Sequence, residues 1–166
     1  MNDHPFSVPR YEPQAGPADL LVTQYRDAGY PAAQQLVQGD YASNAALQQA
    51  LAARLELARC GLRLELRGDE AFIWPLQALA QAAGLQGDEI LLSRLPGSRR
   101  VFCVHCAQCQ PASAAESLTC AHCGVHLEVR RHFSQRLGAY LGVCADADHP
   151  YADLPNADLP NGEPRP

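Results

Sequence analysis

Short apolar runs that alternate with helical periodicities, followed by two Cys-x-x-Cys pairs, predict an α/β fold with a metal-binding module. The expected architecture is a small parallel three-layer βαβαβ domain, then a four-cysteine zinc-ribbon-like module, with disordered termini. Proline-rich and acidic segments at the two ends lack the apolar content of a core. The expected divisions are an extended arm over residues 1–17, the α/β domain over 18–95, the metal module over 96–143 and an acidic, proline-rich tail over 144–166.

Three apolar segments predict the strands of the α/β domain. The run Leu20–Thr23 suits a buried strand, leucines alternate with charged residues from Leu62 to Leu66, and Ile90–Leu92 follows a Gly-Asp turn. The connections between these runs carry helical patterns and are short. Such connections indicate parallel strands joined by helical crossovers.

Two helices are predicted between these strands. Ser43 can cap the first, in which leucines recur at helical spacing before Gly61. The second covers about 72–83, and Pro75 either lies in its first turn or kinks it. Pro31 is expected to open a further helical turn or two.

The metal module is predicted from two Cys-x-x-Cys hooks, which thirteen residues separate. Each hook places two sulfurs on one side of a tight turn, so two facing hooks offer four thiolates to one tetrahedral ion. Disulfides would need an oxidising compartment, and the N-terminal segment carries no secretory pattern. The predicted metal ligands are Cys103, Cys106, Cys120 and Cys123.

Two segments beside the hooks also carry predictions. The polar segment 110–113, between the hooks, is expected to be a flexible loop. The apolar segment 137–142, after them, is expected to pack against the first domain.

Zinc is the expected metal, in a structural role, because four thiolates leave no open coordination position. Iron in the same site, as in a rubredoxin-like electron carrier, is the alternative that the ligand type allows. Cys109 continues the spacing of a ferredoxin-type run, but the expected fourth cysteine is absent. We therefore expect Cys109 to be a free thiol, and His105 and His122 to be exposed residues of the hooks.

Charge is unevenly distributed along the chain. All thirteen basic residues are arginine, and the net charge is −5. Residues 94–143 carry six arginines against two acids, whereas the segments before and after are both acidic. A basic module fits an acidic protein partner. The arginines lack interleaved aromatic residues, so we do not expect nucleic acid to bind, although a free-standing zinc-ribbon module that binds nucleic acid or protein is the alternative function.

No catalytic or cofactor-binding residue is predicted. A Gly-x-Gly-x-x-Gly fingerprint does not follow the first strand, and Asp69 and Glu70 stand at the turn where a pyrophosphate would lie. His132 and Ser134 lack a third group that would orient them for nucleophilic catalysis. No apolar run approaches the roughly 18 residues of a membrane-spanning helix, so we expect no membrane association.

The acidic tail contains the repeat Ala-Asp-Leu-Pro-Asn twice, at 152–156 and 157–161. Five residues bury too little for a fold, so composition predicts disorder. An alternative is that Leu154 and Leu159 dock on a partner.

Several motifs resemble those of a known family. Cys-Val-His-Cys at 103–106, Thr-Cys-x-x-Cys-Gly at 119–124 and the stretch 132–143 resemble the C-terminal part of the dimethylamine monooxygenase subunit DmmA family. Upstream, the stretch 68–74 and the helix after it are similar to that family's N-terminal module, itself similar to part of ferredoxin-NADP-reductase nucleotide domains. The likeness covers about residues 60–143.

The resemblance implies a small subunit of a cytoplasmic bacterial monooxygenase that converts dimethylamine into methylamine and formaldehyde with NADPH and O₂. It implies two partners, a haem-bearing oxygenase subunit and a flavin and iron–sulfur reductase subunit, which would carry those cofactors. Residues 18–95 would then be a degenerate reductase-like domain, since Asp69 stands where the reductase-like pattern often has proline. This chain would act in assembly or electron-transfer docking rather than as the catalytic centre.

Overall fold

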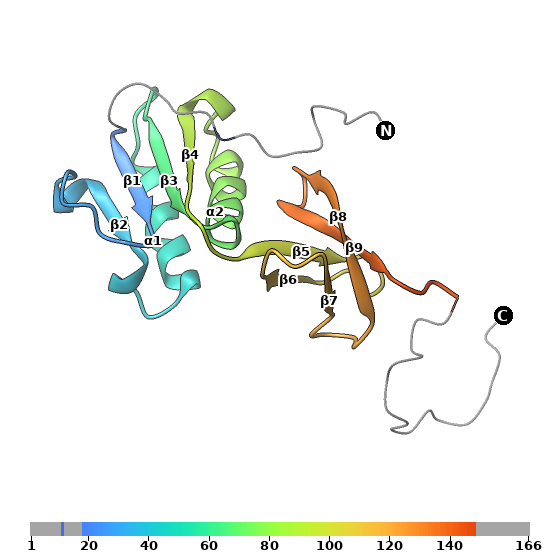
Figure 1. Ribbon diagram of the computed structural model, residues 1–166. Coiled ribbons are helices and arrows are strands. Elements are labelled where there is room, and N and C mark those ends of the chain that lie inside the picture. Colours follow the sequence, from blue (N-terminus) through green and yellow to red (C-terminus); the bar gives the residue numbers. More distant parts are fainter. Residues whose placement is uncertain (1–10, 12–17, 149–166) are drawn as a thin grey trace.

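Two β-sheets lie side by side in the computed structural model, which describes residue 11 and residues 18–148 (Figure 1). The predicted fold class is confirmed: a parallel sheet with helices comes first, and a second sheet carries the cysteine hooks. Most of the predicted arm and tail lies outside the described residues.

The first sheet has four parallel strands in the order β2-β1-β3-β4. Helix α1 connects β2 to β3, and helix α2 connects β3 to β4. The bounds are β1 Leu20–Thr23, β2 Gln35–Val37, α1 Asn44–Glu56, β3 Leu64–Gly68, α2 Glu70–Ala82 and β4 Ile90–Arg94.

The segment after Pro31 differs from its prediction. The expected helix is replaced by strand β2 between two 3-10 turns, Ala32–Gln34 and Gln38–Asp40. Leu36 and Val37 are both 5% exposed in this strand, which pairs with β1. A three-residue strand is too short for its alternation to be distinguished from a helical turn.

Helix α1 follows its predicted pattern. The Ser43 side chain accepts a hydrogen bond from the N–H of Ala46, and Leu47, Leu51 and Leu55 are buried. These leucines share one core with the inward leucines of β1 and β3.

Helix α2 begins earlier than either prediction for Pro75 assumed. Asp69 caps the helix by accepting a hydrogen bond from the N–H of Phe72, so Pro75 is the sixth helical residue and lies in the interior. A proline there cannot donate to the carbonyl of Ala71. The helix nevertheless buries Phe72 and Leu76 against the sheet.

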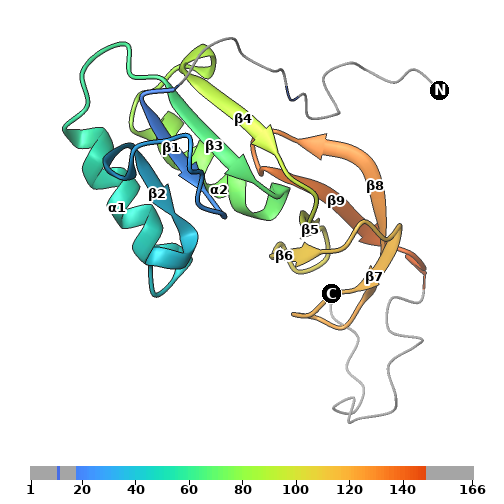
Figure 2. The same cartoon turned by 60° about the vertical axis from the view of Figure 1, so that its left-hand side comes forward.

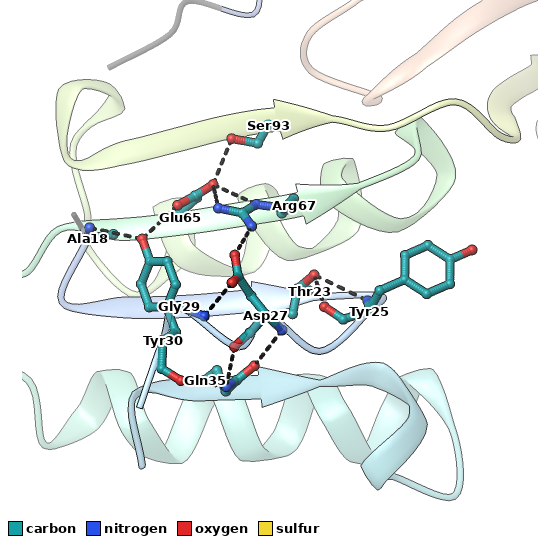
Figure 3. Close-up of polar contacts among 10 residues, drawn as sticks. All are labelled: Ala18, Thr23, Tyr25, Asp27, Gly29, Tyr30, Gln35, Glu65, Arg67 and Ser93. Atoms are coloured by element: carbon teal, nitrogen blue, oxygen red, sulfur yellow. Dashed lines mark hydrogen bonds and ion pairs between the residues drawn. The ribbon is translucent and has the colours of Figure 1, made fainter. Parts of the chain in front are cut away.

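Both helices lie on the same face of the parallel sheet, where they contact each other (Figures 1 and 2). Within the described part of the chain, the opposite face is covered by the segment between β1 and β2, from which Tyr30 and Asp27 reach Glu65 and Arg67. Its centre is the Glu65 carboxylate, which is 4% exposed and accepts hydrogen bonds from three side chains (Figure 3). The donors are Tyr30, Arg67 and Ser93.

The second sheet has five strands in the order β6-β5-β9-β8-β7. The segment after Cys109, predicted to be a flexible loop, forms β6, which pairs antiparallel with β5. The bounds are β5 Arg99–Cys103, β6 Cys109–Ala112, β7 Ser117–Thr119, β8 His126–Ser134 and β9 Ala139–Cys144.

The two sheets meet at a contact between α2 and the β8–β9 hairpin, here called the seam. An irregularity in β8 between Val129 and Phe133 places two extra residues opposite β9. Beyond it, Phe133 is 2% exposed and joins the core of the first sheet, with its ring 4.6 Å from that of Trp74. The apolar segment around Tyr140 therefore packs against the first domain, as its sequence predicted.

Among the residues that the structure describes, no helix has both the length and the apolar character needed to cross a membrane.

Candidate metal centre

The structure brings the four predicted cysteines together. Their Sγ atoms all lie within 4.8 Å of one another. The Sγ–Sγ distances are 3.8 Å for Cys103 and Cys123 and 3.7 Å for Cys106 and Cys120. A tetrahedral ion with metal–sulfur bonds of about 2.3 Å requires sulfurs about 3.8 Å apart. The cluster could therefore hold one metal ion.

The two hooks have the same backbone design. In each, the first cysteine's carbonyl accepts a hydrogen bond from the residue four positions later, at 2.9 Å. That residue is Ala107 in the first hook and Gly124 in the second, with φ of 58° and 74°. A left-handed residue turns the chain back after the second cysteine, so both sulfurs face the same side. The near-equivalence of the hooks explains how sequence spacing alone predicted that these four cysteines would come together.

The sheet fixes where each hook begins. The N–H of Cys103, the last residue of β5, donates to the carbonyl of Gln108, and the N–H of Val104 donates to Gly142 of β9. The N–H of Cys120, just after β7, donates to Val125. Cys103 and Cys120 are buried as a result, whereas the second cysteine of each hook is half-buried.

Gln110 braces the second hook and was missed by sequence reasoning. Its side chain is 6% exposed on β6, and its Oε1 accepts a hydrogen bond of 2.7 Å from the N–H of Ala121. Its Nε2 donates to the carbonyl of Thr119 at 3.5 Å. A glutamine after Cys109 gives no signal by itself, because its partners depend on how β6 folds against the hook.

The electrostatics of the four thiols favour a bound cation. Burial acts to raise the pKa of Cys120, but the N–H groups of His122 and Cys123 and the neighbouring thiols lower it to about 7. Burial, reinforced by the neighbouring cysteines, raises the pKa of Cys123 to about 12. One thiol therefore ionises readily while its neighbour resists a second negative charge. A divalent cation would remove that repulsion and hold all four as thiolates.

Among the described residues, Cys109 and Cys144 are outside the group of four cysteines that could hold a metal. Cys109 is half-buried at the start of β6. Cys144 is half-buried, and its Sγ contacts the carbonyl of Asp146 at 2.9 Å. His105 and His122 are exposed, as predicted.

The turn where a nucleotide phosphate would lie is filled by the chain itself. The Asp69 carboxylate accepts from the N–H of Phe72 at 2.9 Å and from that of Ser98 at 3.0 Å. The N–H of Asp69 donates to the Gln24 side chain at 2.7 Å. An acidic side chain thus occupies the position at the N-terminus of α2 that suits an anion.

The arginines of the second sheet have two different environments. Arg99 donates to the carbonyls of Ser113 and Ala115 and lies over the ring of Tyr140. Arg130 and Arg131, in contrast, are exposed at the β8 irregularity, where Arg130 pairs with an exposed acid on the same strand. The second pair is therefore a part of the basic module that a partner can reach.

Comparison with known proteins gives a family assignment. The family described as "Dimethylamine monooxygenase subunit DmmA-like, C-terminal domain" matches residues 100–143, which include all four hook cysteines. The heme-dependent oxidative N-demethylase delta subunit of Ectopseudomonas mendocina (strain ymp) is 61% identical over 164 residues, covering 90% of this chain and 94% of that protein. No solved structure matches. An identity this high over almost the whole of both chains shows common descent, and the chain belongs to the DmmA-like family of this delta subunit.

Proposed function

We propose that this chain is a small accessory subunit of an oxidative N-demethylase complex. The observation that carries the proposal is the 61% identity to a heme-dependent oxidative N-demethylase delta subunit, which extends over both sheets and the hooks. A site closed by four protein thiolates would leave a bound metal no position for a substrate. The chain therefore acts in assembly or electron-transfer docking, and catalysis belongs to other subunits.

The proposed reaction of the complex is the oxidative demethylation of dimethylamine to methylamine and formaldehyde, with NADPH and O₂. The family description supplies dimethylamine, and the relative's name supplies haem and N-demethylation. The proposed partners are a haem-bearing oxygenase subunit and a flavin and iron–sulfur reductase subunit, in the cytoplasm.

The proposed metal is one zinc ion bound by the four hook cysteines, which holds the second unit, residues 96–143, in its fold. The small core beside the hooks is made of little more than Val125 and Leu127 with the cysteines themselves. A unit with so little core depends on its ion for stability. Cys106→Ser should therefore release the metal and unfold this unit, whereas Cys109→Ser should retain both.

Metal analysis with a visible spectrum tests this assignment on protein purified without added metal. Zinc near one equivalent and a colourless solution are the expected results. A thiolate-to-iron absorption band in the wild type would instead favour the rubredoxin-like carrier, and metal loss from the Cys109 variant would overturn the ligand set.

The first unit, residues 18–95, is proposed to be a scaffold that binds no nicotinamide nucleotide. The Asp69 carboxylate would repel a pyrophosphate at the N-terminus of α2, and its hydrogen bonds already satisfy the nearby N–H groups.

Docking is proposed to use the exposed arginines Arg130 and Arg131, which would meet an acidic surface of a partner subunit. Exposed charges change encounter rates strongly and fold stability little. The double variant Arg130→Glu/Arg131→Glu should keep its metal and melting temperature but associate more slowly with the purified partners. The matched control is Arg54→Glu/Arg59→Glu, which makes the same charge change at exposed positions of the first unit.

Size-exclusion chromatography of separately purified subunits measures whether the complex forms, and stopped-flow mixing measures how fast the variants associate. Wild-type association kinetics for the Arg130/Arg131 variant, or equal slowing by the control, would contradict docking through this surface.

A further inference from the structure

Glu70 is a carboxylate buried where the two sheets meet. It is the first residue of α2 and is 2% exposed. Its Oε1 accepts hydrogen bonds from the hydroxyls of Tyr11, at 2.7 Å, and Tyr140, at 3.2 Å. The Nε of Arg94 lies 3.3 Å from the same oxygen. One oxygen thus connects the N-terminal segment, the end of β4 and strand β9 of the metal-bearing sheet.

Aromatic packing surrounds this carboxylate. The rings of Tyr11, Trp74, Phe133 and Tyr140 form a continuous series across the seam, with adjacent centroids 4.6–6.2 Å apart. At the turn between β8 and β9, a Cβ on Gly138 would come within 2.9 Å of the Trp74 Cβ. The hairpin therefore lies directly on α2, and Trp74 is at the centre of the contact.

The closed seam also has unfavourable features. Within the described residues, two buried polar atoms have no hydrogen-bond partner, the Oε2 of Glu70 and the Nε1 of Trp74. Both are on the same side of α2, one helical turn apart. Water would satisfy both atoms if the hairpin moved away, so their burial opposes closure. The hydrogen bonds to the other Glu70 oxygen must offset that cost.

We propose that the Glu70 carboxylate is an interdomain lock that holds the metal module against helix α2 through the hydroxyl of Tyr140, while the hydroxyl of Tyr11 shares the same oxygen from outside the module. When the lock is closed, the exposed arginines of β8 keep a fixed orientation relative to the first sheet. When it is open, the module rotates about the connection between β4 and β5, and Trp74 and Phe133 become accessible. Tyr11 contacts Glu70 and Trp74, both on α2, so its hydrogen bond to Glu70 does not depend on the position of the module.

The fluorescence of Trp74 reports this equilibrium, because it is the protein's single tryptophan and is 5% exposed in the closed state. The test uses the metal-loaded full chain with Tyr11→Phe, Tyr140→Phe and the double variant. Each change keeps the ring and removes one hydrogen bond to a charged acceptor, but only Tyr140→Phe removes a bond that crosses the seam. That loss should move the closed–open equilibrium about tenfold or more toward the open state. Acrylamide quenching should rise and the emission maximum should shift to longer wavelength in Tyr140→Phe and in the double variant, and less in Tyr11→Phe.

Two further readings separate opening from other effects. Metal content and far-ultraviolet circular dichroism should stay at wild-type values, because both units remain folded. Tryptic cleavage after Arg94, followed by mass spectrometry, should accelerate. This measurement does not depend on the surroundings of the tryptophan. The matched control is Tyr25→Phe, at a tyrosine that is 71% exposed; it should change none of these quantities.

Two results would overturn the lock. In one, the double variant shows wild-type quenching and wild-type cleavage after Arg94. In the other, metal and helical signal are lost along with the quenching change, which would show that the hydroxyls support the fold itself and not the relative position of two folded units.

Discussion

Ala107 and Gly124 stand at the same place in the two hooks, yet only one of them is a glycine. Both have left-handed backbone, with φ of 58° and 74°. That conformation costs a residue with a Cβ about 1–2 kcal/mol of folding free energy. Glycine avoids this cost, but its greater freedom in the unfolded chain removes about 0.4–1 kcal/mol of the gain. Ala107→Gly should therefore raise the free energy of unfolding by roughly 0.5–1 kcal/mol.

Urea denaturation of the metal-loaded protein measures this change, and a chelator competition should show slower metal release. Gly124→Ala is the reciprocal variant and should be destabilising. A lower stability for Ala107→Gly would show that the first hook does not need the left-handed conformation.

Tyr140 makes the protein less stable as the pH rises into the alkaline range. Burial, followed by the charge and hydrogen bond of Glu70, raises the pKa of Tyr140 to about 12, and the same causes raise the pKa of Tyr11. In the unfolded chain a tyrosine ionises near pH 10. Between about pH 10 and 12 the folded state therefore keeps a proton that the unfolded state has lost, so stability falls as the pH rises through this window. Below pH 10 the contribution is fully present.

Melting temperatures of the wild type and of Tyr140→Phe, measured from pH 9 to 11.5, test this prediction. The wild type should lose stability more steeply than the variant, and absorbance at 295 nm should show at least two tyrosines that titrate late. Parallel slopes for the two proteins would be inconsistent with a raised pKa for Tyr140.

Individual residues were predictable where the signal was local. The four hook cysteines lie in two short motifs, so their spacing indicated their geometry directly. Glu70 could not be recognised in the same way, because its partners Tyr11 and Tyr140 are 59 and 70 positions away in the chain. The sequence analysis interpreted Glu70 only as an acid at the turn where a phosphate would lie.

At the scale of elements, strand β6 is the part of the metal-bearing sheet that supports the second hook. It pairs with β5 and points Gln110 at the backbone of Ala121. Gln110→Ala should leave the N–H of Ala121 without its partner and cost about 1–3 kcal/mol of stability. Metal release to a chelator should accelerate accordingly. Gln108→Ala is the matched control, since that side chain is exposed and only its backbone carbonyl serves the hook.

Equal metal-release rates for the Gln110 and Gln108 variants would show that β6 does not brace the second hook.

The elements themselves were predictable where their residue patterns were strong. The long helices α1 and α2 and the apolar strands gave clear periodicity, although β3 begins two residues later than the leucine alternation suggested. Strand β2, with three residues, was read as helix, and β6 as a loop. Both are short strands whose existence depends on pairing with a neighbour, and that tertiary effect overrides local propensity.

At the scale of the whole molecule, the two sheets share a core at the seam although they carry different groups of residues. The first sheet has a covered polar face centred on Glu65, and the second carries the hooks and the exposed arginines. Residue patterns predicted the order of these units and the packing of the apolar segment around Tyr140 against the first domain, but not that Phe133 would join the core of the first sheet. The β8 irregularity that places Phe133 there has no signature in the strand alternation.

The central claim is that this chain is a required accessory subunit of an oxidative N-demethylase and not its catalytic centre. The most direct measurement is NADPH-dependent dimethylamine demethylation, followed as formaldehyde release, in a complex reconstituted from separately purified subunits. Activity should be lost when this chain is omitted, return on addition of the metal-loaded wild type, and remain low with Arg130→Glu/Arg131→Glu. Full activity without the chain, or turnover by the chain alone, would contradict the account.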